Sequence, residues 1–173
     1  MPCRRAPRGG TAGSAAAMIT LRCLAILMLA LVLPAPAHAR ESLEQLVATA
    51  APGATLSVPA GVHVVHLKLD KPVTLTGEPG AILDGGGYGD IVRISAANVT
   101  VRGLTLRHSG SDLTAMNAGI FIERTARDVV IDGNRIEDSL FGVYLDGAAN
   151  VRVERNVIRG MRSLRVADRG DGI

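Results

Sequence analysis

Apolar and polar residues alternate along most of the chain after residue 53, in short runs with a period of two. Val99 and Val101, and then Leu104 and Leu106, are each separated by a single polar residue. Such alternation is typical of a β-strand with one buried face. Gly, Asn and Asp, which favour turns, interrupt each run after about three to five positions. The pattern therefore predicts many short strands.

The alternating segments also repeat one another. Four segments align, "KPVTLTG", "ANVTVRGLTL", "RDVVIDGNRI" and "ANVRVERNVI", and their first valines are Val73, Val99, Val129 and Val151. Further strand-like segments begin between them at Asp90, Gly119 and Gly142. Self-similarity at a period of roughly 20 to 50 positions marks a solenoid. The β-branched residues, and the lack of a ten-residue helical stripe within the repeats, favour strands over helices.

Strands this short gain stability only when successive circuits stack and hydrogen-bond at a spacing of ~4.8 Å. The sequence therefore predicts an all-β fold, a right-handed parallel β-helix, in which Val153 lies above Ile131. Asn134 and Asn156 fall at one corner, where we expect left-handed backbone angles and stacked amide groups. We interpret these asparagines as a structural ladder and not as ligand contacts.

A short α-helix is predicted within residues 40–53, before the strands. Ser42 and Gln45 fit a capping box, and Pro52–Gly53 ends the helical pattern. The apolar face of this helix consists of Leu43, Leu46 and Val47. We expect the helix to cap the solenoid, whose first turn would otherwise expose its core and unpaired backbone groups.

Residues 1–39 have the pattern of a secretory signal peptide. They contain four arginines and no acid, the apolar run Cys23–Leu33, and an A-x-A cleavage signature at Ala37–Ala39. The rival interpretation, a membrane anchor, is disfavoured because this apolar run is far shorter than the roughly 20 residues that span a bilayer. The sequence thus predicts export to the periplasm, with no membrane span left after cleavage.

Residues 54–173 are predicted to form the β-helix turns. The last two residues, Gly172 and Ile173, repeat the pair Gly119 and Ile120 that opens an earlier strand. We therefore expect the chain to be the N-terminal fragment of a longer solenoid, truncated at its C-terminal end.

Removal of the leader changes the charge and cysteine content. Of 19 Lys and Arg residues, the four in the leader are lost and 15 remain against 16 Asp and Glu, so the basic character of the whole chain is no evidence for a nucleic-acid partner. Both cysteines, Cys3 and Cys23, leave with the leader. The mature segment, residues 40–173, suffices for one domain, which must be stabilised by packing and backbone hydrogen bonds without disulfides.

One pair of acidic residues has the spacing of a possible catalytic or cation-binding pair. Asp132 and Glu154 are separated by the same interval as Val129 and Val151, so stacking would place their carboxylates one turn from each other. The alternative is an ordinary charge ladder with Arg102, Arg152 and Arg155, and we favour it.

Candidate metal ligands are few. His63 and His66, three positions apart, would point to opposite faces of a strand. His108 and Met116 bracket an insertion, and Met161 begins a second one. A thioether and an imidazole together suit copper(I), but spacing does not show whether these side chains meet. We therefore assign no catalytic, cofactor-binding or metal-binding residue from the sequence.

The two insertions, Ser109–Ala118 and Met161–Asp171, interrupt different circuits at the same phase. They should therefore emerge on one side of the coil, where solenoids commonly bind partners. No G-x-S-x-G, P-loop, C-x-x-C or H-E-x-x-H motif occurs. The chain has only two Phe, two Tyr and no Trp, which argues against a sugar-binding groove lined by stacking platforms.

The succession "ILDGGGYGDIVRISAANVTVRGLTLRHSG", "DLTAMNAGIFIERTARDVVIDGNRIEDSLFGVYL", "RNVIRGM" and "DRGDGI" resembles the NosD type, the periplasmic maturation proteins of nitrous oxide reductase. The resemblance extends from Leu43 to Ile173. It implies a right-handed β-helix that associates with membrane ABC transporter subunits, and with nitrous oxide reductase or its copper chaperone. It also implies copper delivery to the client enzyme, with no cofactor bound in this fragment.

The leading hypothesis is therefore a non-catalytic periplasmic scaffold in copper-centre assembly. The alternative is a carbohydrate-active β-helix protein: a polysaccharide lyase, hydrolase or epimerase. If the chain is a carbohydrate-active enzyme, Asp132 and Glu154 should line a concave groove together with an arginine. If it is a scaffold, these carboxylates should form ordinary ion pairs on the surface.

Overall fold

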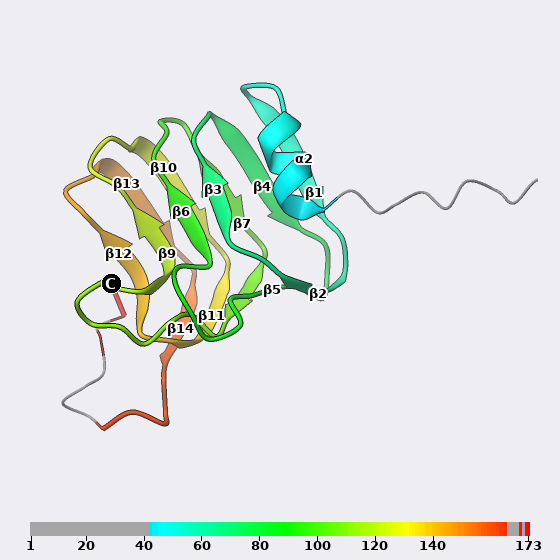
Figure 1. Ribbon diagram of the computed structural model, residues 1–173. Helices are drawn as coiled ribbons and strands as arrows, with labels where there is room; N and C mark the ends of the chain where they lie inside the picture. Colours follow the sequence, from blue (N-terminus) through cyan, green and yellow to red (C-terminus); the bar gives the residue numbers. More distant parts are fainter. Residues whose placement is uncertain (1–41, 166–169, 171) are drawn as a thin grey trace, which may run out of the picture. The chain divides into compact units, whose positions relative to one another are not determined.

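The computed structural model describes residues 42–165, 170 and 172–173 of the chain (Figure 1). The predicted signal peptide, residues 1–39, lies outside the described residues. Within the described part, no helix has both the length and the hydrophobicity that a membrane crossing requires.

Three parallel sheets are wound in chain order, and each full turn contributes one strand to each sheet. The first sheet consists of β1 (Ala54–Val58), β4 (Val73–Gly77), β7 (Thr100–Arg102), β10 (Arg127–Asp132) and β13 (Ala149–Glu154). The second consists of β2 (Gly61–Val64), β5 (Ala81–Asp84), β8 (Thr105–Arg107), β11 (Arg135–Ser139) and β14 (Val157–Gly160). The third consists of β3 (Leu67–Leu69), β6 (Val92–Ile94), β9 (Ala118–Ile122) and β12 (Phe141–Leu145). The predicted parallel β-helix is confirmed.

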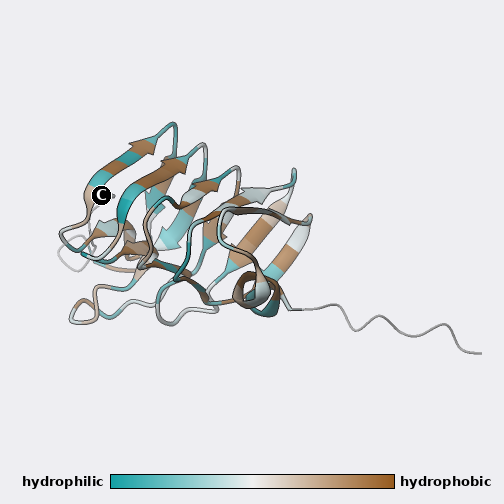
Figure 2. Cartoon of the chain, turned by 90° about the horizontal axis from the view of Figure 1, so that it is seen from above, coloured by the Kyte–Doolittle hydropathy of each residue, from teal (hydrophilic) through white to brown (hydrophobic). Residues whose placement is uncertain are grey.

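Vertical registry follows the sequence repeat. Val129 pairs with Val151, and Ile131 pairs with Val153 above it and with Val101 below it. These side chains point inward, and Val101, Val129 and Ile131 have no solvent exposure. Hydrophobic residues therefore alternate with hydrophilic ones along the strands (Figure 2), and the stacked inward positions form one continuous core.

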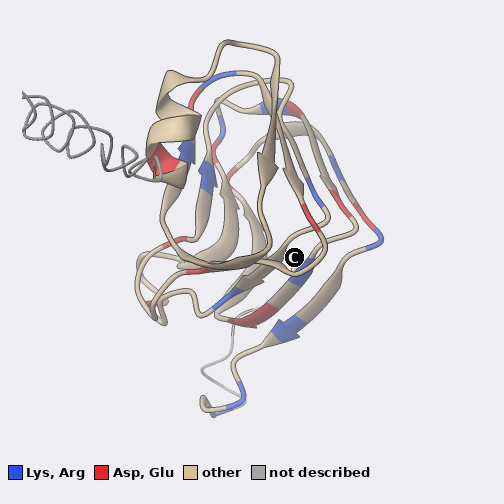
Figure 3. Cartoon of the chain, turned by 90° about the vertical axis from the view of Figure 1, so that its right-hand side faces the viewer, with Lys and Arg blue, Asp and Glu red and all other residues tan. Residues whose placement is uncertain are grey.

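Charged side chains alternate in sign along the outer face of the second sheet. Asp84, Arg107, Glu137 and Arg159 occupy successive turns in register. Arg107 lies 2.8 Å from Asp84, and Arg159 lies 3.6 Å from Glu137 (charged residues are coloured in Figure 3). Opposite charges in register avoid the repulsion that equal charges would cause at this spacing.

The predicted capping helix is α2 (Leu43–Thr49). The Ser42 hydroxyl accepts a hydrogen bond of 3.2 Å from the Gln45 N–H, as an N-cap residue does. Leu43 and Val47 are buried, and the helix contacts β3 and β1 of the first turn. The helix thereby covers apolar side chains that have no turn below them.

An asparagine ladder forms at the corner between the first and second sheets. The Oδ1 atom of Asn134 accepts from the Leu104 N–H at 3.0 Å, and its Nδ2 donates to the Val101 carbonyl at 2.9 Å. Asn156 repeats both bonds one turn later, to the Asn134 N–H and the Ile131 carbonyl. The predicted amide ladder is confirmed.

The prediction of left-handed backbone angles at these asparagines is wrong. Positive φ values occur one residue earlier, at Gly103 (68°), Gly133 (62°) and Arg155 (54°). The residue before each asparagine adopts the left-handed conformation and turns the chain. The asparagine amide itself then hydrogen-bonds to backbone groups of the turn below. Glycine at two of these three positions fits the steric demand of the left-handed region.

Replacing Gly133 by alanine should lower the free energy of unfolding by about 1–2 kcal/mol. A Cβ atom here would meet no other atom within 4 Å, so the left-handed backbone is the only source of the cost. Gly133→Asn is the matched control and should cost less, because asparagine tolerates this conformation. Urea unfolding measures both, and equal losses for the two variants would contradict the explanation.

Candidate functional site

Three loops lie at the corner between the second and third sheets, where the two insertions were predicted to emerge together. Residues 108–117 connect β8 to β9, and residues 161–165 begin the second insertion after β14. The Gly-rich segment 85–91 connects β5 to β6 at the same corner. The first insertion is held against this segment by a 2.8 Å hydrogen bond from the Gly110 N–H to the Gly89 carbonyl.

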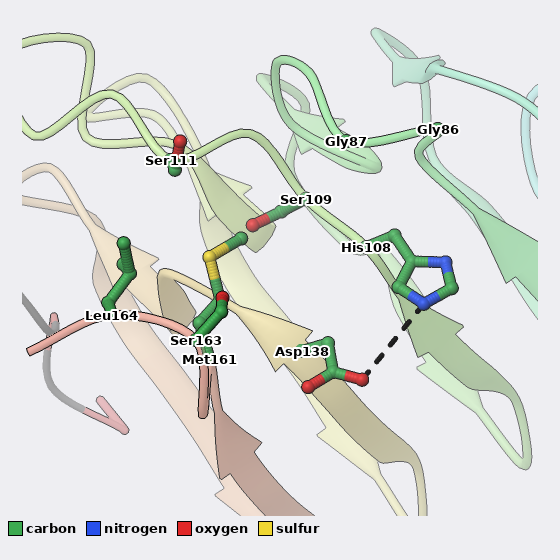
Figure 4. A pocket seen from close by; sticks show the side chains of 9 residues that line it. All are labelled: Gly86, Gly87, His108, Ser109, Ser111, Asp138, Met161, Ser163 and Leu164. Carbon is green, nitrogen blue, oxygen red and sulfur yellow. Dashed lines mark ion pairs between the residues drawn. The ribbon is translucent and has the colours of Figure 1, made fainter.

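An open pocket of about 550 Å³ lies between these loops (Figure 4). It is lined by Gly86, Gly87, His108, Ser109, Ser111, Asp138, Met161, Ser163 and Leu164. Both insertions contribute to the lining, so the prediction that they share one side of the coil is confirmed for their described residues.

Asp84 orients the His108 ring through a contact with its Nδ1 atom. Its Nδ1 atom lies 3.1 Å from both carboxylate oxygens of Asp84. Asp84 is buried, and it also accepts hydrogen bonds from Arg107 Nε at 2.8 Å and from the Gly86 N–H at 3.0 Å. Burial raises the pKa of Asp84, but these hydrogen bonds and the nearby imidazole outweigh the effect of burial, so the pKa lies below its ordinary value.

The contact with Asp84 defines the tautomer of His108, because an ionised carboxylate only accepts hydrogen bonds. Nδ1 therefore carries the proton, and a neutral His108 keeps its lone pair on Nε2.

The Nε2 atom of His108 faces Asp138 across a distance of 4.0 Å (Figure 4). Asp138 is the extra residue of a β-bulge, since Glu137 pairs with Arg159 while Ser139 pairs with Gly160. A bulge changes the direction of the side chain it carries. Both residues of this pair have left-handed backbones, with φ of 59° at His108 and 45° at Asp138.

Ser109 anchors the wall of the pocket. Its side chain is fully buried, and its hydroxyl accepts from the Leu140 N–H of the next turn at 3.0 Å and donates to the Gly110 carbonyl at 3.0 Å. Because both hydrogen-bonding functions are used within the fold, Ser109 fixes the start of the first insertion and does not act as a free nucleophile.

The structure distinguishes the two methionines that the sequence offered as candidate ligands beside His108. The thioether of Met161 points into the pocket (Figure 4). Met116 is 37% exposed and is not part of the pocket lining. Among the described residues, no group of three or more His, Cys, Asp or Glu side chains is arranged to hold a metal ion. The pocket instead presents one imidazole nitrogen, one carboxylate and one thioether.

Asp132 and Glu154 do stack as the repeat predicted, but they pair with arginine. They are direct register partners, and Arg155 lies 2.5 Å from the Asp132 carboxylate and 3.8 Å from that of Glu154. The hydrogen bond to Asp132 raises the pKa of Arg155, whose side chain is 70% exposed. Arg102 bonds to the Thr76 hydroxyl instead, at 3.2 Å. These contacts match the charge-ladder interpretation.

His63 and His66 bind different backbone carbonyls. His63 Nε2 lies 2.9 Å from the Pro59 oxygen, and His66 Nδ1 lies 2.7 Å from the Asp90 oxygen. His66 also stacks on Tyr88, with 4.2 Å between ring centroids. Both histidines are thereby tied to the first turns, although the Nε2 atom of His66 is buried without a hydrogen-bond partner among the described residues.

Sequence reasoning missed an aromatic cluster on the outer face of the third sheet. Phe121 pairs in register with Tyr144 above it and with Arg93 below it. The guanidinium carbon of Arg93 lies 4.1 Å from the Phe121 ring centroid, and Phe141 packs edge-on against Tyr144. The separation of Phe121 and Tyr144 along the chain, close to one circuit of the coil, is the signal that would have found the pair.

No protein-family model matches this sequence. The chain is similar to two curated proteins named "Probable ABC transporter binding protein NosD". The protein from Pseudomonas aeruginosa is 40% identical over 117 residues, which are 68% of this chain and 27% of that protein. The protein from Stutzerimonas stutzeri is 41% identical over 116 residues, which are 67% of this chain and 27% of that protein. The chain thus spans about a quarter of the length of these relatives.

Among solved structures, the chain is similar to a pectin methylesterase in complex with a hexasaccharide. The TM-score is 0.49 at 15% sequence identity, over 64% of this chain and 44% of that one. A likeness of this size carries no argument about function.

Proposed function

We propose that this chain, a NosD-type protein, is a non-catalytic accessory protein that acts in the periplasm during copper-centre assembly of nitrous oxide reductase. The observation that carries the proposal is the identity of about 40% with NosD proteins across two thirds of the chain. The parallel β-helix supports it, because a stacked coil can present loops from distant parts of the sequence on one side.

An ABC transporter is the proposed membrane partner. The names of the relatives describe binding to such a transporter. In this chain, the loops at the corner between the second and third sheets are the irregular, solvent-facing segments that a partner would contact. The reductase, or its copper chaperone, would bind to the same accessory protein, and copper would be the cargo that is transferred.

The carbohydrate-active alternative receives no support from the acidic pair on which it depended. Asp132 and Glu154 are held by Arg155 on the outer face of the first sheet, and neither lines the pocket between the loops. A glycosidase requires two carboxyl groups that flank a substrate.

Deletion of the gene for this protein tests the proposal. The reductase should then accumulate with less than a tenth of its normal copper and activity, and the full-length gene supplied in trans should restore both. Metal analysis of the purified reductase measures the copper. A reductase fully loaded with copper in the deletion strain would reject the proposed function.

A further inference from the structure

We infer that the groove between α2 and the edge strand β2 binds an extended peptide segment of a second protein, which pairs with β2 as an added strand. The peptide carries β-branched or aliphatic side chains at alternate positions and one cationic side chain. This inference goes beyond the proposed function and does not depend on it, since the lining of the groove shares no residue with the pocket between the loops.

The groove has a volume of about 720 Å³ and follows β2 along its whole length. Residues 59–65 form one wall, and the N-terminal part of α2 forms the other through Ser42, Leu43, Glu44 and Leu46. The helix packs on β3 and β1 of the same turn, and the groove separates it from β2 (Figure 1). The space therefore has the elongated form that one extended chain requires.

The backbone of β2 has an open side that faces this groove. β2 is the last strand of the second sheet at this end of the coil, and its strand partner is β5. Gly61 and Val65 donate their N–H groups to the β5 side. Because successive residues of a strand direct their backbone groups to opposite sides, those of Val62 and Val64 face the groove. Unpaired donors and acceptors at this spacing are what an added strand uses.

The side chains of β2 do not protect this edge. Val62 is 53% exposed and Val64 is 66% exposed, and both lie on the outer face of the sheet. Edge strands are commonly protected from further pairing by lysine, proline or inward-pointing charges, and Gly61–Val64 contains none of these. An added strand with β-branched or aliphatic side chains at alternate positions would pack against both valines.

The charge of the groove specifies the partner further. Glu44 is the one carboxylate in the lining, which holds no Lys or Arg. Leu43 and Leu46 supply apolar surface on the same side. A peptide whose side chains toward α2 are one cationic and one aliphatic residue therefore complements the groove in charge and polarity.

Two other occupants fit less well. After the predicted cleavage, residues 40 and 41 precede Ser42, and two residues reach about 7 Å, which is about half of the length of a four-residue strand. A second coil would have to bring its own strand within ~4.8 Å of β2, but α2 covers this end of the coil (Figure 1). A single strand of a partner enters beside the helix without this obstruction.

Binding of a defined peptide to the exported protein tests the inference. The probe is acetyl-Val-Lys-Val-Leu-Val-amide, and calorimetric titration should give a Kd below about 1 mM. Hydrogen exchange measured by NMR should show the amides of Val62 and Val64 exchanging rapidly in the free protein. Saturating peptide should slow both at least about 10-fold.

N-methylated probes separate strand pairing from simple apolar contact. One probe is methylated at the valine nitrogens and the other at the lysine and leucine nitrogens. An added strand directs only one of these two sets of N–H groups at β2, so one methylated probe should lose binding at least about 10-fold and the other should retain it.

Val64→Pro removes one N–H from the groove and leaves the pairing with β5 intact, because proline is tolerated where the N–H of an edge strand faces outward. In a variant shown to be folded by circular dichroism, binding should weaken at least about 10-fold. Val64→Thr is the matched control, which keeps the N–H, and it should lose less than about 3-fold. Glu44→Gln should weaken binding about 2- to 5-fold.

Four results would overturn the inference: no binding of the probe, equal binding of both methylated probes, wild-type binding by folded Val64→Pro, or protection of both valine amides in the free protein. Protection independent of protein concentration would assign the groove to this chain itself, and protection that rises with concentration would assign it to a second copy. If Val64→Pro does not fold, the methylated probes decide.

Discussion

Replacing Ile131 by alanine is expected to lower the free energy of unfolding by about 3–4 kcal/mol. Ile131 has no solvent exposure and lies between Val101 and Val153 in a column of inward side chains. Its neighbours are fixed by parallel hydrogen bonds on both sides, so they cannot collapse into the space that the lost atoms leave. The loss therefore includes a cavity cost in addition to the lost burial of apolar surface.

Chemical unfolding monitored by circular dichroism measures this loss. Ile131→Val, which removes one methylene group, is the matched control and should cost about 1 kcal/mol. Val153→Ala, one turn later in the same column but partly exposed, should also cost less than Ile131→Ala. A loss below about 1 kcal/mol for Ile131→Ala would show that this side chain is not packed between the turns as described.

The fold was predictable because the interval between equivalent residues of the repeat identifies which residues pair in successive turns. The interval between Ile131 and Val153 corresponds to one circuit, and the structure pairs these two residues directly. The first turn gave a weaker signal, since its circuit is shorter, with Ala54 of β1 paired to Val73 of β4, and its corner after β1 carries no asparagine. Unequal circuits conceal a repeat even where the backbone pairing continues without a break.

The pocket was not predictable to the same degree. His108 and Asp138 occupy equivalent positions of successive turns, since Arg107 pairs with Glu137 immediately before them, but a β-bulge at Asp138 separates this pair from Met161 of the next turn. A bulge opposes two residues of one strand to one residue of the next, so the spacing along the chain does not identify which residue Met161 stacks on, and the pattern of apolar residues does not reveal the bulge because pairing resumes after it. The sequence thus singled out His108 and Met161 separately, and only the structure shows that they line one pocket with Asp138.

Replacing Asn134 by alanine is expected to lower the free energy of unfolding by about 3 kcal/mol. Asn134 is 2% exposed, and its amide satisfies the Leu104 N–H and the Val101 carbonyl of the turn below. Alanine would leave both backbone groups buried without partners, at about 1–3 kcal/mol each. The cost arises mainly from these orphaned groups and less from lost packing.

Asn134→Leu separates the two contributions. Leucine occupies the equivalent position one turn earlier, at Leu104, so it fits the corner and fills the volume but cannot hydrogen-bond. We expect it to remain about 2 kcal/mol less stable than wild type in urea unfolding. Asn156→Ala, at a less buried rung of the ladder, should cost less than Asn134→Ala. If Asn134→Leu matched wild-type stability, filling the corner would suffice, and the amide ladder would contribute nothing to holding successive turns in register.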